Sequence, residues 1–168
     1  PDGCPRVRTV AVAGGTCPRP LADRWSGRAA FFHCRGSAET TVVTTMGRHT
    51  AVAGRPATGR PAPNSTVYVL GADRRPLPMG EVGEVWAGGD CVSAGYLGDD
   101  ALNAERYAPD PFLGEGRTMF RTRGLGRWTP DGGLEHLGRA AERPGVPDTR
   151  ALLRLAGERT AGPVTVTR

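Results

Sequence analysis

Thiols and imidazoles are the side chains of this sequence with the widest reactivity. The four cysteines, Cys4, Cys17, Cys34 and Cys91, form no C-x-x-C pair, and the three histidines lack ligand-like spacing, so a zinc site and a disulfide framework both match poorly. His33 is adjacent to Cys34, but neighbouring side chains on a strand point to opposite faces and would not meet as base and nucleophile. We expect four reduced, partly buried thiols.

The cationic side chains exclude one branch of chemistry. All 22 basic residues are Arg, so no Schiff base, lysine general base or lysine-assisted phosphate chemistry can come from this polypeptide. The net charge is +5, yet the Arg are spread along the chain, and the absence of Lys, Ile and Gln favours a GC-rich genome as the cause. Aromatic residues make up 6%, which argues against a stacking platform for nucleic acid. An Arg-rich module for RNA or an acidic partner remains an alternative.

The N-terminal third predicts one unit of a parallel sheet. Residues 6–13 alternate and are rich in Val, and residues 29–34 form a second apolar run, so both are predicted strands. A short helix is expected between them from about Pro20, with Leu21 and Trp25 on one face. Strand, helix and strand in this order are typical of a doubly wound layer.

This arrangement indicates where a ligand would bind. Ligands of open α/β sheets bind in the loops at the carboxyl ends of the strands. These loops are residues 14–18 and 35–41.

A β-rich region is predicted after the Gly- and Pro-rich stretch at residues 54–63. The period of the apolar residues changes there, and the expected elements are strands at 66–70, 84–87 and 118–122, a short helix at 99–107, and a hairpin at 128–137 closed at Asp131-Gly132. The five large aromatic residues predicted to build its core are Trp86, Tyr96, Phe112, Phe120 and Trp128. Residues 149–159 are a further candidate helix.

The sequence has features of a non-membrane piece of a longer protein. No apolar run approaches the roughly 20 residues that cross a bilayer, and the opening residues lack a signal-peptide pattern, so we expect a soluble protein of the cytoplasm with no membrane partner. Because the first residue is not Met, the chain is expected to be cut from something longer.

Six sequence blocks in order carry a family resemblance. They are R-T-V-A-V-A-G-G from residue 8, G-S-A-E-T-T-V from 36, G-R-P-A-P-N-S-T-V-Y-V-L from 59, P-M-G-E-V-G-E-V-W-A-G-G from 78, A-G-Y-L-G-D-D-A-L-N-A-E-R-Y-A-P-D-P-F from 94, and F-R-T-R-G-L-G-R-W-T-P-D-G-G-L-E-H-L-G-R from 120. Over residues 5–139 the chain resembles the adenylation domains of nonribosomal peptide synthetases. The block around Asn103 points to the peptide-synthetase branch over acyl-CoA ligases and luciferases.

The resemblance implies a fold and a division of the chain. The fold class expected is α/β plus antiparallel β, a strand-helix-strand remnant of a doubly wound layer followed by a distorted β-barrel subdomain. Residues 1–58 would end the α/β subdomain, residues 59–139 would form the β-rich subdomain, and residues 140–168 would be a divergent tail.

The resemblance also implies cofactors, partners and site residues. Family enzymes use ATP and Mg²⁺ to make an aminoacyl-adenylate, release AMP, and load the amino acid on a carrier protein. Carried over by position, Gly36, Glu39 and Arg139 are the remaining nucleotide-binding residues, and Glu39 also matches a Mg²⁺ ligand. The plainer alternatives are that Glu39 caps the short helix that follows it and that Arg139 is a surface arginine.

The chain departs from the family pattern at several site positions. In the block that reads Tyr-Gly-Pro-Thr-Glu in the family, Arg35 replaces the aromatic that stacks on adenine and Ala38 replaces a phosphate-contacting Thr. In the Thr-Gly-Asp-Leu block, Gly124 replaces the Asp that accepts bonds from both ribose hydroxyls, and the hinge Asp falls on Ala141. The phosphate loop and the catalytic Lys of the family are not matched by any segment.

We therefore interpret the chain as a partial adenylation domain. It would lack catalytic residues of its own and act as a structural or docking part of a synthetase. The alternative in the enzyme class is that flanking sequence completes a working amino-acid adenylating enzyme.

Overall fold

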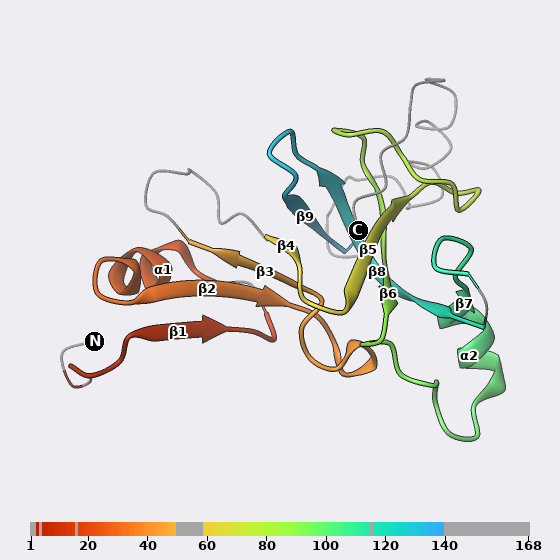
Figure 1. Cartoon of the computed structure of the whole chain (residues 1–168), viewed down its shortest axis with the longest axis horizontal. Helices are drawn as coiled ribbons and strands as arrows, with labels where there is room; N and C mark the ends of the chain where they lie inside the picture. Colours follow the sequence, from red (N-terminus) through yellow and green to blue (C-terminus); the bar gives the residue numbers. More distant parts are fainter. Residues whose placement is uncertain (1–2, 4, 16, 50–58, 115, 140–168) are drawn as a thin grey trace.

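The computed structural model describes residues 3, 5–15, 17–49, 59–114 and 116–139. Two sheets lie side by side, with the N-terminal sheet on the left of Figure 1 and the second sheet on the right. The described part thus combines α/β and antiparallel β structure, as expected. The second sheet is open rather than closed into a barrel, because β5 has one hydrogen-bonded neighbour, and the expected β-barrel is wrong in that respect.

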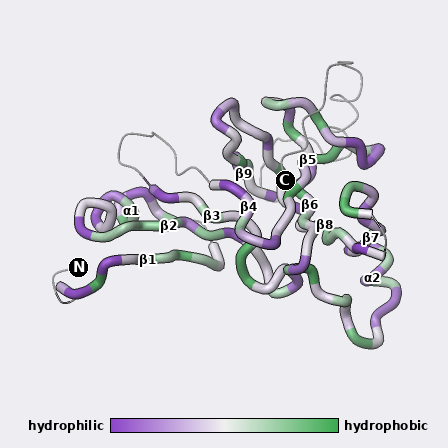
Figure 2. The backbone as a smooth tube through the Cα atoms, in the orientation of Figure 1, coloured by the Kyte–Doolittle hydropathy of each residue, from purple (hydrophilic) through white to green (hydrophobic). Residues whose placement is uncertain are grey.

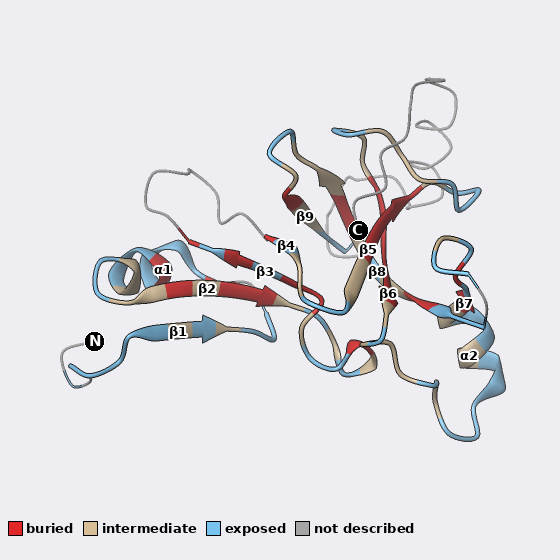
Figure 3. Cartoon of the chain, viewed as in Figure 1, coloured by how far each residue is buried: buried red, intermediate tan, exposed pale blue. Residues whose placement is uncertain are grey.

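The first sheet contains the predicted strand-helix-strand unit. Strand β1 (Thr9–Val12) pairs in parallel with β2 (Ala30–Arg35), and α1 (Arg19–Ser26) connects them. Two strands that the sequence did not predict complete it, since β3 (Thr45–Arg48) and β4 (Arg60–Pro61) continue the sheet in antiparallel fashion. In Figure 3 the outer strand β1 has no buried residue, β2 has no exposed residue, and β3 alternates buried and exposed residues.

Helix α1 packs on this sheet through a different residue from the one expected. Ala22 is 1% exposed and contacts Phe31 and Cys17 in a small core, with Trp25 packed against it. Leu21, predicted on the same face as Trp25, is 39% exposed. Helices place residues three apart, as well as four apart, on one face, and here the buried stripe follows the spacing of three.

The second sheet begins with the edge strand β5 and its neighbour β6, and both carry buried residues on their two faces. Strand β5 (Ser65–Leu70) pairs with β6 (Gly83–Gly89), and their side chains point alternately to two separate cores. One core contains Tyr68 and Leu70 with residues of other strands, and the other contains Val67 and Val69. Figure 2 shows hydrophobic residues in the second sheet and also in the first.

The rest of the second sheet is organised by its longest strand. Strand β8 (Thr118–Trp128) pairs with β6 along one edge, and along the other with β7 (Tyr107–Pro109) near its start and β9 (Leu134–Arg139) near its end. The hairpin between β8 and β9 closes at the predicted turn. Strand β8 continues well past the strand predicted at 118–122.

The short helix and the aromatic core follow the sequence with one exception. Helix α2 (Asp100–Arg106) begins where predicted, because the Asp99 carboxylate accepts a hydrogen bond from the Leu102 backbone N–H at 2.9 Å. Trp86 and Phe120 are buried, and Phe112 and Trp128 pack against the two cores. Tyr96 belongs to neither core and has a different contact, described below.

The candidate helix at 149–159 and Cys4 lie outside the described residues. Cys17, Cys34 and Cys91 are free thiols. Within the described ranges, no helix has the length and apolar character needed to span a membrane.

Candidate functional site

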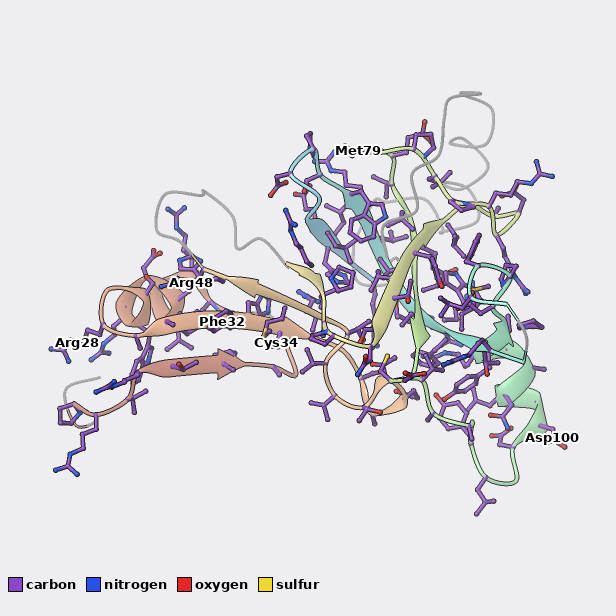
Figure 4. The ribbon with its side chains drawn as sticks, in the orientation of Figure 1. Arg28, Phe32, Cys34, Arg48, Met79 and Asp100 are labelled. Atoms are coloured by element: carbon purple, nitrogen blue, oxygen red, sulfur yellow. The ribbon has the colours of Figure 1, made fainter. Side chains whose placement is uncertain are left out.

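A cavity of about 450 Å³ lies where the two sheets meet. It opens at the carboxyl end of β2, the edge predicted to bind a ligand, and in Figure 4 the labelled Cys34 lies at this end of the strand. The volume falls within the range of small-molecule sites, roughly 300–1,000 Å³. Its lining includes residues of both predicted loops, of the middle of β8 and of the end of β9, in particular Gly14, Gly15, Arg35, Gly36, Ser37, Thr45, Gly124, His136, Gly138 and Arg139.

The loop after β2 has a packing reason for its glycine. A Cβ on Gly36 would lie 2.3 Å from the backbone oxygen of Val42, so no other residue fits without moving the chain. The Thr44 N–H donates to the Arg35 carbonyl at 2.7 Å and folds the loop back on the strand. Gly36 is therefore placed at the cavity by the close approach of two backbone segments.

Gly124 reaches the cavity through a bulge in β8. The pairing with β6 shifts between Val85 and Trp86, which leaves Thr122 and Arg123 without cross-strand partners on β6. The Thr122 hydroxyl donates to the Val85 carbonyl at 2.6 Å and accepts from the Gly124 N–H at 3.0 Å, so this side chain bridges the two strands at the bulge. Bulges of this kind commonly re-aim a side chain next to a functional site.

The described lining of the cavity is cationic. Arg35 and Arg139 line it, and none of the lining residues that the structure describes is Asp or Glu. Burial, followed by the charges of Arg35 and His33, lowers the pKa of His136 to about 3, so this imidazole is neutral at pH 7. An anion entering the cavity would relieve this concentration of positive charge.

Hydroxyl groups add hydrogen-bond donors to the same cavity. Thr45 is 1% exposed, and its Oγ1 has no hydrogen-bond partner among the described residues. The neighbouring Thr44 hydroxyl donates to Thr40 Oγ1 at 2.8 Å. A buried hydroxyl without a partner costs free energy, so the Thr45 hydroxyl favours a ligand that brings an acceptor.

Glu39 lies near the cavity but is not part of its lining. It belongs to a single 3-10 turn (Ala38–Thr40), and its carboxylate accepts a hydrogen bond from the Tyr96 hydroxyl. Burial raises the pKa of Glu39, but the bonds from Tyr96 and its own backbone and the charge of Arg106 outweigh it, so the net shift is downward. Burial and the Glu39 carboxylate in turn raise the pKa of Tyr96 to about 12. Glu39 is thus an ionised carboxylate held by a neutral phenol.

The structure sorts the residues predicted from the sequence. It brings Gly36 and Arg139 together in one cavity and leaves Glu39 beside it. His33 and Cys34 make no catalytic pair, since the His33 Nε2 atom lies 3.2 Å from the Gly15 carbonyl. In the described residues no group of three or more His, Cys, Asp or Glu could hold a metal ion.

Three contributors to the site went unpredicted, namely Thr45, His136 and Tyr96. Thr45 lies on a strand that the sequence did not predict, and His136 is an isolated histidine in a hairpin. Tyr96 is the first aromatic residue of the fifth sequence block, which identifies it as a family position, but the sequence pattern assigns it to the core.

The fold and the cavity define a mixed α/β protein with a site suited to an anionic ligand. The chain belongs to the family of AMP-binding enzymes, whose family model matches residues 2–97.

Known relatives agree with this assignment. Adenylate-forming reductase 06235 of Coprinopsis cinerea is 46% identical over 140 residues, which cover 83% of this chain and 14% of that protein. Bacitracin synthase 3 of Bacillus licheniformis is 42% identical over 138 residues, covering 82% of this chain and 2% of that protein. The resemblance to adenylation domains of nonribosomal peptide synthetases is confirmed, at partial coverage.

A solved structure has the same fold. The N-terminal subdomain of Klebsiella oxytoca NpsA, in complex with 3-hydroxybenzoyl-AMSN, matches with a TM-score of 0.70 and 26% identity over 77% of this chain and 33% of that one. The chain therefore spans a minor part of each of these proteins.

Proposed function

We propose that this chain is the part of a peptide-synthetase adenylation domain that binds the nucleoside and phosphate of ATP or AMP, and that it forms no adenylate by itself. The observation that carries the proposal is the cavity between the two sheets, where the loop containing Gly36 and the end of β9 containing Arg139 meet in a cationic lining. Arg at such a position donates charged hydrogen bonds to phosphate oxygens.

Glu39 is our proposed Mg²⁺ ligand. Mg²⁺ in nucleotide sites is commonly held by one or two carboxylates together with phosphate oxygens and water. The carboxylate of Glu39 is ionised and fixed by Tyr96, so it fits the role of a single protein ligand that shares the ion with a phosphate. The ion would then neutralise part of the phosphate charge.

Residues inside the cavity support the absence of catalysis. Gly124 offers no carboxylate to hold the ribose, and Arg35 offers no ring to stack on adenine. The sequence also has no Lys. Losing one charged hydrogen bond of the ribose kind costs about 1.5–3 kcal/mol, a tenfold to hundredfold loss of affinity. We propose a structural or docking role within the synthetase for this reason.

The wider assignments follow from the family and are proposals too. The parent enzyme would activate an amino acid with ATP and load it on a carrier protein, and the chain would dock against the rest of that synthetase. We also propose residues 1–58 and 59–139 as its two units, with 140–168 as a separate tail. The near coincidence of the first two with the two sheets supports the division.

Calorimetric titration of the purified chain with AMP, and with ATP plus Mg²⁺, tests the binding. We expect measurable affinity that Arg139→Ala weakens about tenfold or more, the effect of one charged hydrogen bond. Arg28→Ala is the matched control, because Arg28 lies at the far end of the first sheet from the cavity (Figure 4). Equal effects of the two substitutions, or no binding at all, would refute the proposal.

Pyrophosphate exchange tests the second half of the proposal. The isolated chain should show no amino-acid-dependent exchange of pyrophosphate into ATP. Exchange above background would instead identify it as a working adenylating enzyme.

A further inference from the structure

Gly124 stands in the cavity at the position where the family has an Asp that binds the ribose hydroxyls, so this part of the cavity lacks the acceptor that ribose needs. A Cβ built on Gly124 points into space bounded by the Thr122 hydroxyl at 3.2 Å and by the His136 Nδ1 atom at 3.9 Å. A carboxylate at this position would lie against the imidazole. In this chain the position carries only a hydrogen atom, and the imidazole faces the opening.

Two guanidinium groups, which are hydrogen-bond donors, line the cavity around this opening. Arg35 and Arg139 both line the cavity, the charge of Arg35 contributes to the lowered pKa of His136, and Arg139 lies three residues beyond His136 on β9. A ribose hydroxyl needs an acceptor such as a carboxylate, whereas a phosphate supplies acceptors and needs donors. The described lining, with two Arg and no acid, provides the second kind of environment.

The unpartnered hydroxyl of Thr45 is an independent observation in the same direction. Thr45 is 1% exposed and lines the same cavity. Its Oγ1 atom has no hydrogen-bond partner among the described residues. A phosphate oxygen could accept its hydrogen bond. The neutral oxygens of an unphosphorylated ribose would accept the same hydrogen bond less strongly.

We propose that the cavity prefers a nucleotide that carries a second phosphate on the 2′- or 3′-oxygen of its ribose. This rests on the proposed nucleotide-binding function and specifies its ligand class. The exchange of groups has a known parallel: in dinucleotide-binding folds an acidic residue holds the ribose 2′-hydroxyl, and a nearby Arg accommodates the 2′-phosphate. Here Gly124 stands in place of the acid, and Arg35 and Arg139 supply the positive charge of the lining.

The test compares three ligands on the full chain by calorimetry. They are AMP, adenosine 2′,5′-bisphosphate and adenosine 3′,5′-bisphosphate, and we expect one bisphosphate to bind about tenfold tighter than AMP or better. Which of the two binds tighter identifies the phosphorylated oxygen. AMP binding at least as tightly as both bisphosphates overturns the inference and leaves the proposed function standing. Failure of all three ligands to bind overturns both.

Two variants test the residues behind the preference. Gly124→Asp should abolish the bisphosphate preference and tighten AMP, and Gly124→Ala is the control that adds the Cβ without the charge. An equal effect of Ala and Asp would contradict the charge argument. Arg35→Gln should reduce bisphosphate affinity about tenfold more than it reduces AMP affinity, and this second variant remains informative if substitution at Gly124 impairs folding.

Discussion

His136 should make the free energy of unfolding fall steeply in mild acid. Its pKa is about 3 in the folded chain, against an ordinary value near 6.5 in an unfolded one. A folded pKa below the unfolded pKa means that the unfolded chain binds the proton first, so stability is complete above pH 6.5 and is lost as the pH falls toward 3. His136→Gln removes this titration and keeps a polar side chain at the cavity.

The size of the effect follows from proton linkage. Between about pH 6 and pH 4 the unfolded chain holds nearly one more proton than the folded chain at this site, which corresponds to about 1.4 kcal/mol per pH unit. Over the whole interval the loss reaches roughly 4 kcal/mol, a large share of the 5–15 kcal/mol of a typical domain.

Urea denaturation at pH 7, 6, 5 and 4 measures this dependence in both proteins. We expect the slope of unfolding free energy against pH to be smaller in His136→Gln by about 1.3 kcal/mol per pH unit between pH 6 and 4. All carboxylates are common to the two proteins, so the difference in slope isolates the imidazole. Equal slopes, or an NMR titration of the His136 ring with a midpoint near 6.5 in the folded chain, would refute the reasoning.

Three further substitutions test individual contacts. Arg123→Gly should raise the unfolding free energy by about 0.5–1 kcal/mol in urea denaturation, because Arg123 has φ of 61° and its ion pair with Glu105 is exposed; a decrease would show that the pair outweighs the strain. Tyr68→Phe should lower it by about 1–3 kcal/mol, because the buried Tyr68 hydroxyl donates to the Asp110 carboxylate at 2.9 Å; an unchanged urea midpoint would contradict this. Tyr96→Phe should raise the pKa of Glu39, because it removes a bond that the ionised carboxylate accepts, and carboxyl NMR titration would show no change if that bond were absent.

Local patterns predicted most of the elements and explain why. The alternating Val-rich run became β1, the Asp99 cap set the start of α2, and the Asp131-Gly132 turn closed the β8–β9 hairpin. Each depends on neighbours within a few residues, which a sequence displays directly. Strand β3 was not predicted because its stability comes from pairing with β2 across a loop. Its sequence T-M-G-R has little β propensity of its own.

The residues of the candidate site could be identified from the sequence, but their arrangement could not. Position within the family motifs identified Gly36, Glu39 and Arg139, but the cavity joins the first and third and leaves Glu39 bound to Tyr96 outside its lining. The sequence could not place Arg35 and His136 at one cavity, since the two are about 100 residues apart and come from different sheets.

By itself, then, the sequence determined the family, the strand-helix-strand unit, and the loss of a carboxylate at Gly124. Only the tertiary structure decided what that loss means, because the charge around Gly124 comes from side chains of two other strands, β2 and β9. The bulge in β8 turns Gly124 toward His136, β2 ends with Arg35 at the same cavity, and an acceptor-poor, cationic environment results.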